Sequence, residues 1–259
     1  MTDALDDFDR RQLTFDDDTK VVYVAGTGPA VVVMTEMPGI TPHVARFARW
    51  VRDAGLTVWL PSLFGRDGAE PTNELFGEAF GSACVQREFD AFAAGVPSPM
   101  VSWLRQLAAH AHTECGGPGV GAIGMCFTGN FALALVLEDS VLAPVMAQPS
   151  LPFDDPAGTF IHDADMVTIR RRLDAESLTV LAYRFEGDPF CPKARFDTFR
   201  ERLGDRLLAR ELPDSAAALD WIGAPHSVVT TCLIDAEGEP TAAARNEILA
   251  FFTERLQAR

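Results

Sequence analysis

The sequence lacks any apolar run of the roughly eighteen residues that a membrane-spanning helix requires. Its opening segment, MTDALDDFDRRQLTFDDDTK, is acidic and has no apolar core, so it matches neither a signal peptide nor a membrane anchor. We therefore expect a cytoplasmic protein without a membrane partner.

Cysteine is also scarce. The 5 cysteines are widely spaced and form no Cys-x-x-Cys pair, which argues against both a disulfide framework and a zinc site. His110 and His112 could suggest a metal, but residues two apart on a helix point in different directions. The sequence therefore implies no metal and no cofactor.

Positive charge is limited as well. The chain has 22 lysines and arginines against 37 aspartates and glutamates, a formal net charge of -15. Such a surface repels phosphate backbones and anionic lipids. Nucleic acids are therefore not expected among its partners.

Hydrophobic residues, by contrast, make up 47% of the 259 residues, enough for a sizeable core in a single domain spanning 1–259. Short apolar runs alternate with segments of helical periodicity. This alternation predicts an α/β fold, with a mostly parallel central sheet covered by helices on both faces. The expected strands are 21–25, 30–36, 56–61, 120–126, 141–148, 178–185 and 206–212. The expected helices with the clearest end signals are 41–54, 98–113 and 241–257.

Two long connections, 62–97 and 149–177, interrupt this alternation. Connections of this length in a compact domain are either functional or locally folded. Both are candidates for the walls of a pocket.

Cys126 lies where an expected strand ends and a helix begins, at the carboxyl edge of the sheet where ligands bind. Gly124, Thr128 and Gly129 supply the small residues of a nucleophile elbow, with cysteine in place of serine. Such a turn exposes the side chain, points the helix N-terminus at it and frees the next backbone N–H to bind an oxyanion. The alternative is that Cys126 is a buried packing residue, and the motif alone favours neither interpretation.

A thiol nucleophile needs a base and a group that orients the base, and in elbow hydrolases the acid and then the histidine follow the nucleophile. Beyond Cys126 the histidines are His162 and His226. His226 is favoured because it stands in a Gly/Pro-containing loop after the strand at 206–212, which gives the rigid support that catalysis requires.

Asp188 is the candidate acid. It follows the strand at 178–185 in a turn that contains Gly187 and Pro189. Its alternative role is an Asx-turn or a helix cap, as for most aspartates beside glycine and proline. Three residues in the required order, each after a separate strand, favour the catalytic interpretation.

Six motifs are spread along the chain: TEMPG (35–39), LPSLFGR (60–66), QRE (86–88), GMCFTG (124–129), GDPFCP (187–192) and APHS (224–227). Together they resemble the dienelactone hydrolases, cysteine-using members of the α/β-hydrolase fold. GMCFTG is similar to the family's Gly-x-Cys-x-Gly-Gly, and GDPFCP keeps its Gly-Asp-x-x-x-Pro. The resemblance spans most of the chain and implies an α/β-hydrolase fold.

The resemblance also implies roles for single residues. It makes Cys126 the nucleophile, Asp188 the orienting acid and His226 the base. It places Glu36 beside the thiol of the resting enzyme, where a carboxylate disfavours the thiolate and so protects it from oxidation. The alternative role of Glu36 is a cap on the helix that begins near Thr41.

Substrate contacts follow from the same resemblance. The backbone N–H groups of Met37 and Phe127 would bind the oxyanion, and Arg87 would hold a substrate carboxylate with its guanidinium fork. The alternative for Arg87 is a surface arginine with Glu88 or Asp90 nearby.

The chain departs from the family pattern at two positions. Thr128 stands where the elbow usually has glycine, and a β-branched residue crowds a tight turn. Thr230 stands four residues after His226, where a second carboxylate-binding arginine is common. One arginine instead of two weakens the case for the carboxylated dienelactone as substrate.

The sequence thus predicts a hydrolase that cleaves small ester or lactone substrates through a Cys-His-Asp triad with a thioester intermediate. The first alternative is a non-catalytic small-molecule-binding or regulatory protein of the same fold. A class I glutamine amidotransferase is a weaker alternative, because these enzymes usually carry His-x-Glu whereas Ser227 and Val228 follow His226. We expect a monomer or a small homo-oligomer, with a small-molecule substrate as the partner.

Overall fold

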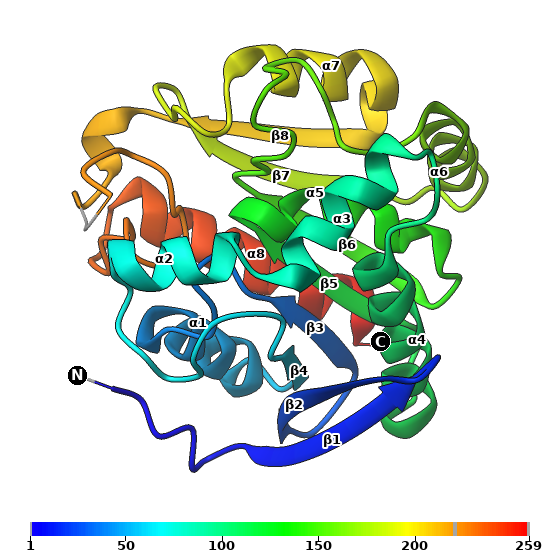
Figure 1. The fold of residues 1–259 in the computed structure, drawn as a ribbon, viewed down its shortest axis with the longest axis vertical. Helices are drawn as coiled ribbons and strands as arrows, with labels where there is room; N and C mark the ends of the chain where they lie inside the picture. The colour runs from blue at the N-terminus through cyan, green and yellow to red at the C-terminus, as the bar shows by residue number, and fades with distance from the viewer. Residues whose placement is uncertain (1, 220–221, 258–259) are drawn as a thin grey trace.

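The computed structural model describes residues 2–219 and 222–257, and its strands form one eight-stranded sheet in the order β1-β2-β4-β3-β5-β6-β7-β8 (Figure 1). Strands β3 to β8 run parallel to one another, and β1 and β2 form an antiparallel edge. The strands are β1 Asp9–Phe15, β2 Asp18–Gly26, β3 Ala30–Met34, β4 Thr57–Pro61, β5 Val120–Met125, β6 Val141–Ala147, β7 Val180–Phe185 and β8 Leu207–Leu212.

All of the expected strands are present, which confirms that part of the prediction. The sequence did not reveal β1. Its residues, DRRQLTF, are mostly polar and largely exposed, because the strand lies at the edge of the sheet and pairs on one side with β2. An edge strand buries too little surface to leave an apolar signature.

Helices cover both faces of the sheet and confirm the predicted fold class (Figure 1). Apolar side chains of α1 and α8 pack in a core on one face, and those of α4, α6 and α7 pack in a core on the other. The helices are α1 Pro42–Asp53, α2 Asn73–Phe80, α3 Ala83–Ala93, α4 Pro99–Cys115, α5 Gly129–Ala134, α6 Asp163–Ala175, α7 Lys193–Leu203 and α8 Pro240–Leu256.

The predicted helices at 41–54, 98–113 and 241–257 correspond to α1, α4 and α8. Thr41 caps α1 as expected, since its hydroxyl accepts a hydrogen bond from the N–H of Val44 at 3.3 Å. Both long connections are locally folded: the first contains α2 and α3, and the second contains α6. Within the described residues, no helix combines the length and the apolar composition that crossing a membrane requires.

Candidate functional site

Cys126 lies in a sharp turn between β5 and α5, at the start of the single-turn helix η1 (Cys126–Thr128). Its φ is +53°, a left-handed conformation that costs free energy in a residue with a side chain and that marks functional turns. The turn tolerates no Cβ at its glycines. A Cβ on Gly124 would lie 2.0 Å from the carbonyl oxygen of Thr128, and one on Gly129 would lie 2.5 Å from Cα of Pro149. The geometry is that of a nucleophile elbow.

Thr128 fits this turn because its hydroxyl is used within it. Oγ1 accepts a hydrogen bond from the N–H of Met125 at 3.0 Å and lies 3.2 Å from the carbonyl oxygens of Met34 and Thr35. The side chain is fully buried. Thr128 therefore connects the elbow to the end of β3. The sequence had suggested that its β-branched side chain would crowd the turn.

His226 and Asp188 form a buried pair. Nδ1 of His226 lies 2.8 Å from Oδ2 and 3.0 Å from Oδ1 of Asp188. Oδ1 also accepts hydrogen bonds from the N–H groups of Phe190 and Cys191, at 2.9 and 3.0 Å. Asp188 thus contacts the predicted base and also forms an Asx-turn at the end of β7.

The environment of His226 favours its protonated form. Burial alone would lower the pKa of this histidine, but the Asp188 carboxylate and the nearby Cys126 sulfur outweigh burial and raise the pKa well above its usual value. Nε2 is buried and has no hydrogen-bond partner among the described residues. In unliganded enzymes the bond between base and nucleophile is often long and tightens with substrate. His226 can therefore act as a strong base towards Cys126.

Glu36 follows β3 and is 3% exposed. Its carboxylate accepts hydrogen bonds from Nε2 of Gln148 at 3.2 Å, from Oγ of Ser227 at 2.9 Å and from the hydroxyl of Thr230. The cap of α1 is supplied by Thr41. Glu36 thus connects the end of β3 with the histidine loop.

The backbone amides of Met37 and Phe127 are the predicted oxyanion donors. Met37 lines the same cavity as Cys126, and Phe127 occupies the first turn after it. Neither N–H donates any of the loop, turn or cap hydrogen bonds found among the described residues. An oxyanion would be the natural acceptor for both.

A cavity of about 260 Å³ brings Glu36, Met37, Cys126 and His226 together. Apolar side chains form most of the remaining lining, namely Phe76, Phe153, Phe190 and Ile222. Phe76 comes from the first long connection and Phe153 from the second. Both connections therefore wall this cavity.

Arg87 lies elsewhere. Its guanidinium is 3.8 Å from Asp18, its side chain is 60% exposed, and it borders a surface hollow with Trp103. The structure does not bring Arg87 to the Cys126 cavity. The ion-pair partner is Asp18, and Glu88 is also close enough to be affected: burial raises the pKa of Glu88, while its hydrogen bonds with Ser98 and Met100 and the charge of Arg87 lower it. This position agrees with the surface alternative.

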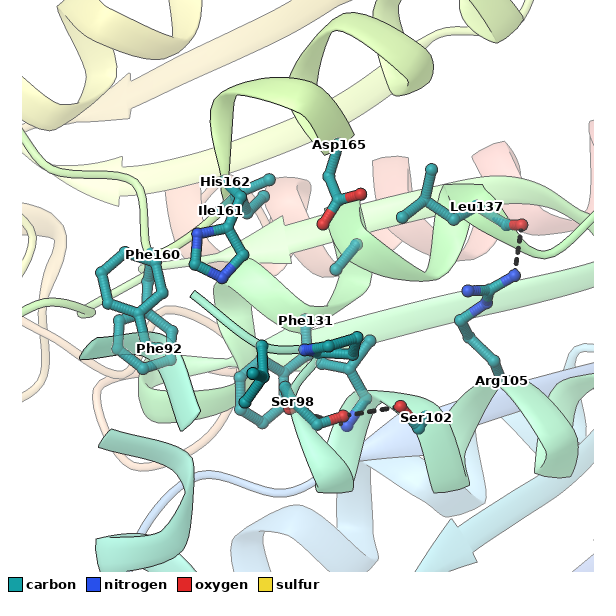
Figure 2. Close-up of a pocket in the computed structure, with 14 residues that line it drawn as sticks. Phe92, Ser98, Ser102, Arg105, Phe131, Leu137, Phe160, Ile161, His162 and Asp165 are labelled. Atoms are coloured by element: carbon teal, nitrogen blue, oxygen red, sulfur yellow. Dashed lines mark hydrogen bonds between the residues drawn. The ribbon is translucent and has the colours of Figure 1, made fainter. Parts of the chain in front are cut away.

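His162 borders a second cavity of about 130 Å³, shown in Figure 2 with its labelled lining residues. Its ring stacks on Phe92 with centroids 4.9 Å apart. Arg105 also lines this cavity and donates a hydrogen bond to the carbonyl oxygen of Leu137 at 2.8 Å (Figure 2). Phe131 packs edge to face against Phe127, the residue after the thiol, at 5.7 Å. The less favoured histidine is thus outside the Cys126 cavity.

The two histidines of α4 have partners that are not metal ligands of a shared site. His112 Nε2 lies 3.1 Å from the carbonyl oxygen of Gly117, and His110 lies 3.7 Å from Glu114. Across residues 2–219 and 222–257, the side chains of His, Cys, Asp and Glu form no group of three or more that could hold a metal ion.

Two residues of the site have no signature in the sequence. Gln148 is fully buried at the end of β6 with φ +37°, and it accepts a hydrogen bond from the N–H of Val228 while donating to Glu36. Arg195 is 1% exposed and donates to backbone carbonyl oxygens on either side of Phe153, including those of Pro149 and Gly158. It also donates to the carbonyl oxygen of Phe190. Arg195 therefore positions two aromatic walls of the cavity.

The sequence matches the model of the dienelactone hydrolase family over residues 19–212. No curated protein matches it.

Solved structures share the fold over nearly their whole length. A putative dienelactone hydrolase from Klebsiella pneumoniae is 17% identical, with a TM-score of 0.64 over 95% of this chain and 98% of that one. A dienelactone hydrolase-like promiscuous phosphotriesterase from metagenomic libraries is 20% identical, with a TM-score of 0.64 over 96% of this chain and 98% of that one. A cold-adapted esterase from an Arctic intertidal metagenomic library is 13% identical, with a TM-score of 0.61 over 96% and 93%. These structures support an α/β-hydrolase fold for this chain.

Proposed function

The chain belongs to the dienelactone hydrolase family, and on that basis we propose that it hydrolyses small ester or lactone substrates with Cys126, His226 and Asp188 as a catalytic triad. The observation that carries this proposal is the orientation of His226. Its Nδ1 is held by Asp188, and its Nε2 is without a partner among the described residues in the cavity that also contains Cys126.

In the first half of the reaction, His226 takes the thiol proton and the sulfur of Cys126 attacks the ester carbonyl carbon. The carbonyl oxygen becomes an oxyanion, which the N–H groups of Met37 and Phe127 stabilise. The C–O bond then breaks, and His226 gives its proton to the departing alkoxide. A thioester on Cys126 and a free alcohol result.

In the second half, His226 removes a proton from water, and the hydroxide oxygen attacks the thioester carbonyl. The N–H groups of Met37 and Phe127 again stabilise the oxyanion. The C–S bond breaks, the thiolate recovers its proton from His226, and the acid is released.

Glu36 controls the resting thiol in this proposal. Its carboxyl group lies in the same cavity as the thiol, where it would keep Cys126 unreactive until substrate enters. Glu36→Gln should therefore alkylate faster at Cys126 with iodoacetamide near neutral pH than the wild type. An unchanged or slower alkylation rate would show that Glu36 does not control the resting thiol.

The direct test is hydrolysis of 4-nitrophenyl acetate by the wild type and by Cys126→Ala. The expected result is turnover by the wild type and none above the uncatalysed rate by the variant. Cys84→Ala is the matched control, because Cys84 hydrogen-bonds with Ser82 and is not among the lining residues of the cavity. Mass spectrometry of the wild type, quenched during turnover, should show an acetyl group on Cys126. An active Cys126→Ala enzyme would refute the mechanism.

The same experiment addresses the alternatives. A non-catalytic binding protein would give no turnover and no acyl adduct. An amidotransferase triad would take its carboxylate from a residue just after the histidine, whereas His226 pairs with Asp188 at the end of β7. The pairing thus favours the hydrolase.

A further inference from the structure

The second cavity is separate from the Cys126 cavity, and the two have none of their described lining residues in common. It lies between α3, α4, α5 and the segment that leads into α6 (Figure 2). Its volume of about 130 Å³ is close to the ~150 Å³ of an apolar cavity that holds one benzene molecule. A compact ligand of that size would fit here.

One end of the second cavity is aromatic. Phe92 stacks on Phe160 with ring centroids 4.2 Å apart, and on the ring of His162 at 4.9 Å. Phe160 has a φ of +53°, a left-handed conformation that costs free energy in a residue with a side chain. Val96, which also lines the cavity, is 48% exposed. An apolar ring bound here would therefore exchange water for aromatic and aliphatic surface.

Arg105 forms the other end, across the cavity from Phe92 and Phe160 in Figure 2. Its Nη2 donates a hydrogen bond to the carbonyl oxygen of Leu137 at 2.8 Å. Its Nε is buried and has no hydrogen-bond partner among the residues that the structure describes. Buried donors in folded proteins are nearly always satisfied, so an N–H left over beside a cavity indicates an acceptor that a ligand supplies.

The chemistry of this end favours an anionic acceptor. The guanidinium forms no ion pair within residues 2–219 and 222–257, and it stands in the middle of α4, away from the negative end of the helix dipole. A carboxylate would satisfy both the donor and the charge of Arg105, whereas a neutral acceptor would satisfy the donor alone.

Asp165 also lines the second cavity and limits which ligands fit. It lies in the first turn of α6, where the N-terminus of the helix stabilises a carboxylate without any ligand. An amine could pair with Asp165, but it would add positive charge beside Arg105 and leave Nε without an acceptor. One negative charge, placed at Arg105, is therefore the best match to the cavity.

We propose that the second cavity is a binding site for a small apolar monocarboxylate, with the carboxylate at Arg105 and the apolar group against Phe92 and Phe160. The planar fork of guanidinium N–H groups matches carboxylate oxygens. This site goes beyond the proposed function, because binding requires neither Cys126 nor His226. Loss of binding and loss of hydrolysis are therefore separate results.

Three probes that share a phenyl ring and differ in charge test the ligand class. Phenylacetate is anionic, phenylacetamide is neutral and 2-phenylethylamine is cationic at about pH 7.5. Isothermal titration calorimetry of the wild type should give a Kd for phenylacetate at least about tenfold lower than for phenylacetamide, and the weakest binding for the amine. Equal or tighter binding of the amide or the amine, or no binding of any probe, would overturn the proposal.

An arginine pair tests the contact. Arg105→Gln keeps a polar side chain without the charge and should raise the Kd of phenylacetate at least about tenfold. Arg87→Gln is the matched control, because Arg87 pairs with Asp18 at the surface and is not among the lining residues of the second cavity. It should keep the wild-type Kd. A wild-type Kd in Arg105→Gln would overturn the proposal.

Filling each cavity in turn locates the bound probe and does not depend on Arg105. Val101→Phe adds a ring at the second cavity from α4 and should abolish binding of phenylacetate. Asn73→Phe adds the same ring at the Cys126 cavity and should leave the Kd unchanged. Circular dichroism verifies that both variants are folded. If Asn73→Phe abolishes binding and Val101→Phe does not, phenylacetate occupies the Cys126 cavity and the proposal is wrong.

Discussion

The hydroxyl of Thr128 accepts a hydrogen bond from the N–H of Met125 at 3.0 Å, within the turn that carries Cys126. The same hydroxyl has the carbonyl oxygens of Met34 and Thr35 within 3.2 Å and can donate its proton to one of them. The elbow and the end of β3, which carry the proposed nucleophile and one of the two proposed oxyanion donors, are therefore joined through one side chain.

Removing this hydroxyl should loosen the elbow. Thr128→Val keeps the shape but leaves buried backbone groups without a partner, so we expect a loss of about 1–3 kcal/mol in the free energy of unfolding, measured in urea. Thr128→Ser keeps the hydroxyl and should remain within about 1 kcal/mol of the wild type, since it loses one methyl group. Equal losses in both variants would show that the methyl group, and not the hydrogen bonds, stabilises the turn.

Asp188→Asn should preserve the turn but disturb the histidine. The amide oxygen can still accept from the N–H groups of Phe190 and Cys191, whereas the amide nitrogen would face Nδ1 and favour the wrong tautomer. We expect kcat on 4-nitrophenyl acetate to fall by up to about 10⁴-fold, with a residual rate from the oxyanion donors.

Asp214→Asn is the control, because this carboxylate accepts from the N–H of Gly187 in the same region but is not among the lining residues of the cavity. It should retain most of the activity. An Asp188→Asn enzyme as active as this control would mean that His226 needs no charged partner.

The sequence predicts those parts of the fold and of the candidate site whose residues leave a pattern within one short segment of the chain. Cys126 comes directly after an apolar strand and Asp188 three residues after another, both in turns marked by glycine or proline, so the strand order alone places them at one edge of the sheet. The strands and the main helices were predictable for the same reason, and β1 was not, because its polar residues bury little surface.

Contacts between distant segments leave no such signal. Arg195 lies in a helix whose sequence is rich in charged residues, which predicts an exposed helix. The side chain is nevertheless buried, because a loop roughly forty residues earlier in the chain directs its carbonyl oxygens at the guanidinium. Arg87 illustrates the converse. Its motif is local, but α3 places it beside Asp18 of the antiparallel edge of the sheet and not at the cavity, and nothing in the QRE motif indicates this.

Arg195→Lys should release the loop that carries Phe153. The guanidinium donates hydrogen bonds to carbonyl oxygens on both sides of Phe153, and one ammonium group cannot reach all of them. Several buried acceptors would therefore lose their hydrogen-bond donor. We expect a loss of about 2–5 kcal/mol in the free energy of unfolding and faster proteolysis within 149–162.

The exposed Lys193 on the same helix provides the comparison, since it pairs with Asp197 at the surface. Lys193→Gln should change the free energy of unfolding by less than about 1 kcal/mol. If Arg195→Lys is as stable as Lys193→Gln and equally resistant to protease, the loop is held by other contacts.

The raised pKa of His226 makes stability depend on pH with a definite sign. The folded state binds this proton more tightly than the unfolded chain, in which histidine has a pKa of about 6.5. The resulting stabilisation is complete below the unfolded pKa and is lost as pH rises through the folded pKa. Unfolding therefore releases a proton in this window, and His226 makes the free energy of unfolding fall by up to about 1.4 kcal/mol per pH unit.

Urea unfolding at several pH values from about 6 to 9 measures this slope, and the difference between the wild type and His226→Gln isolates the contribution of His226 from that of the other titrating groups. The wild type should fall more steeply than His226→Gln across the window. If the wild type and His226→Gln have the same slope, the imidazole gains no proton affinity on folding. The Asp188 carboxylate would then act on the histidine through orientation and not through charge.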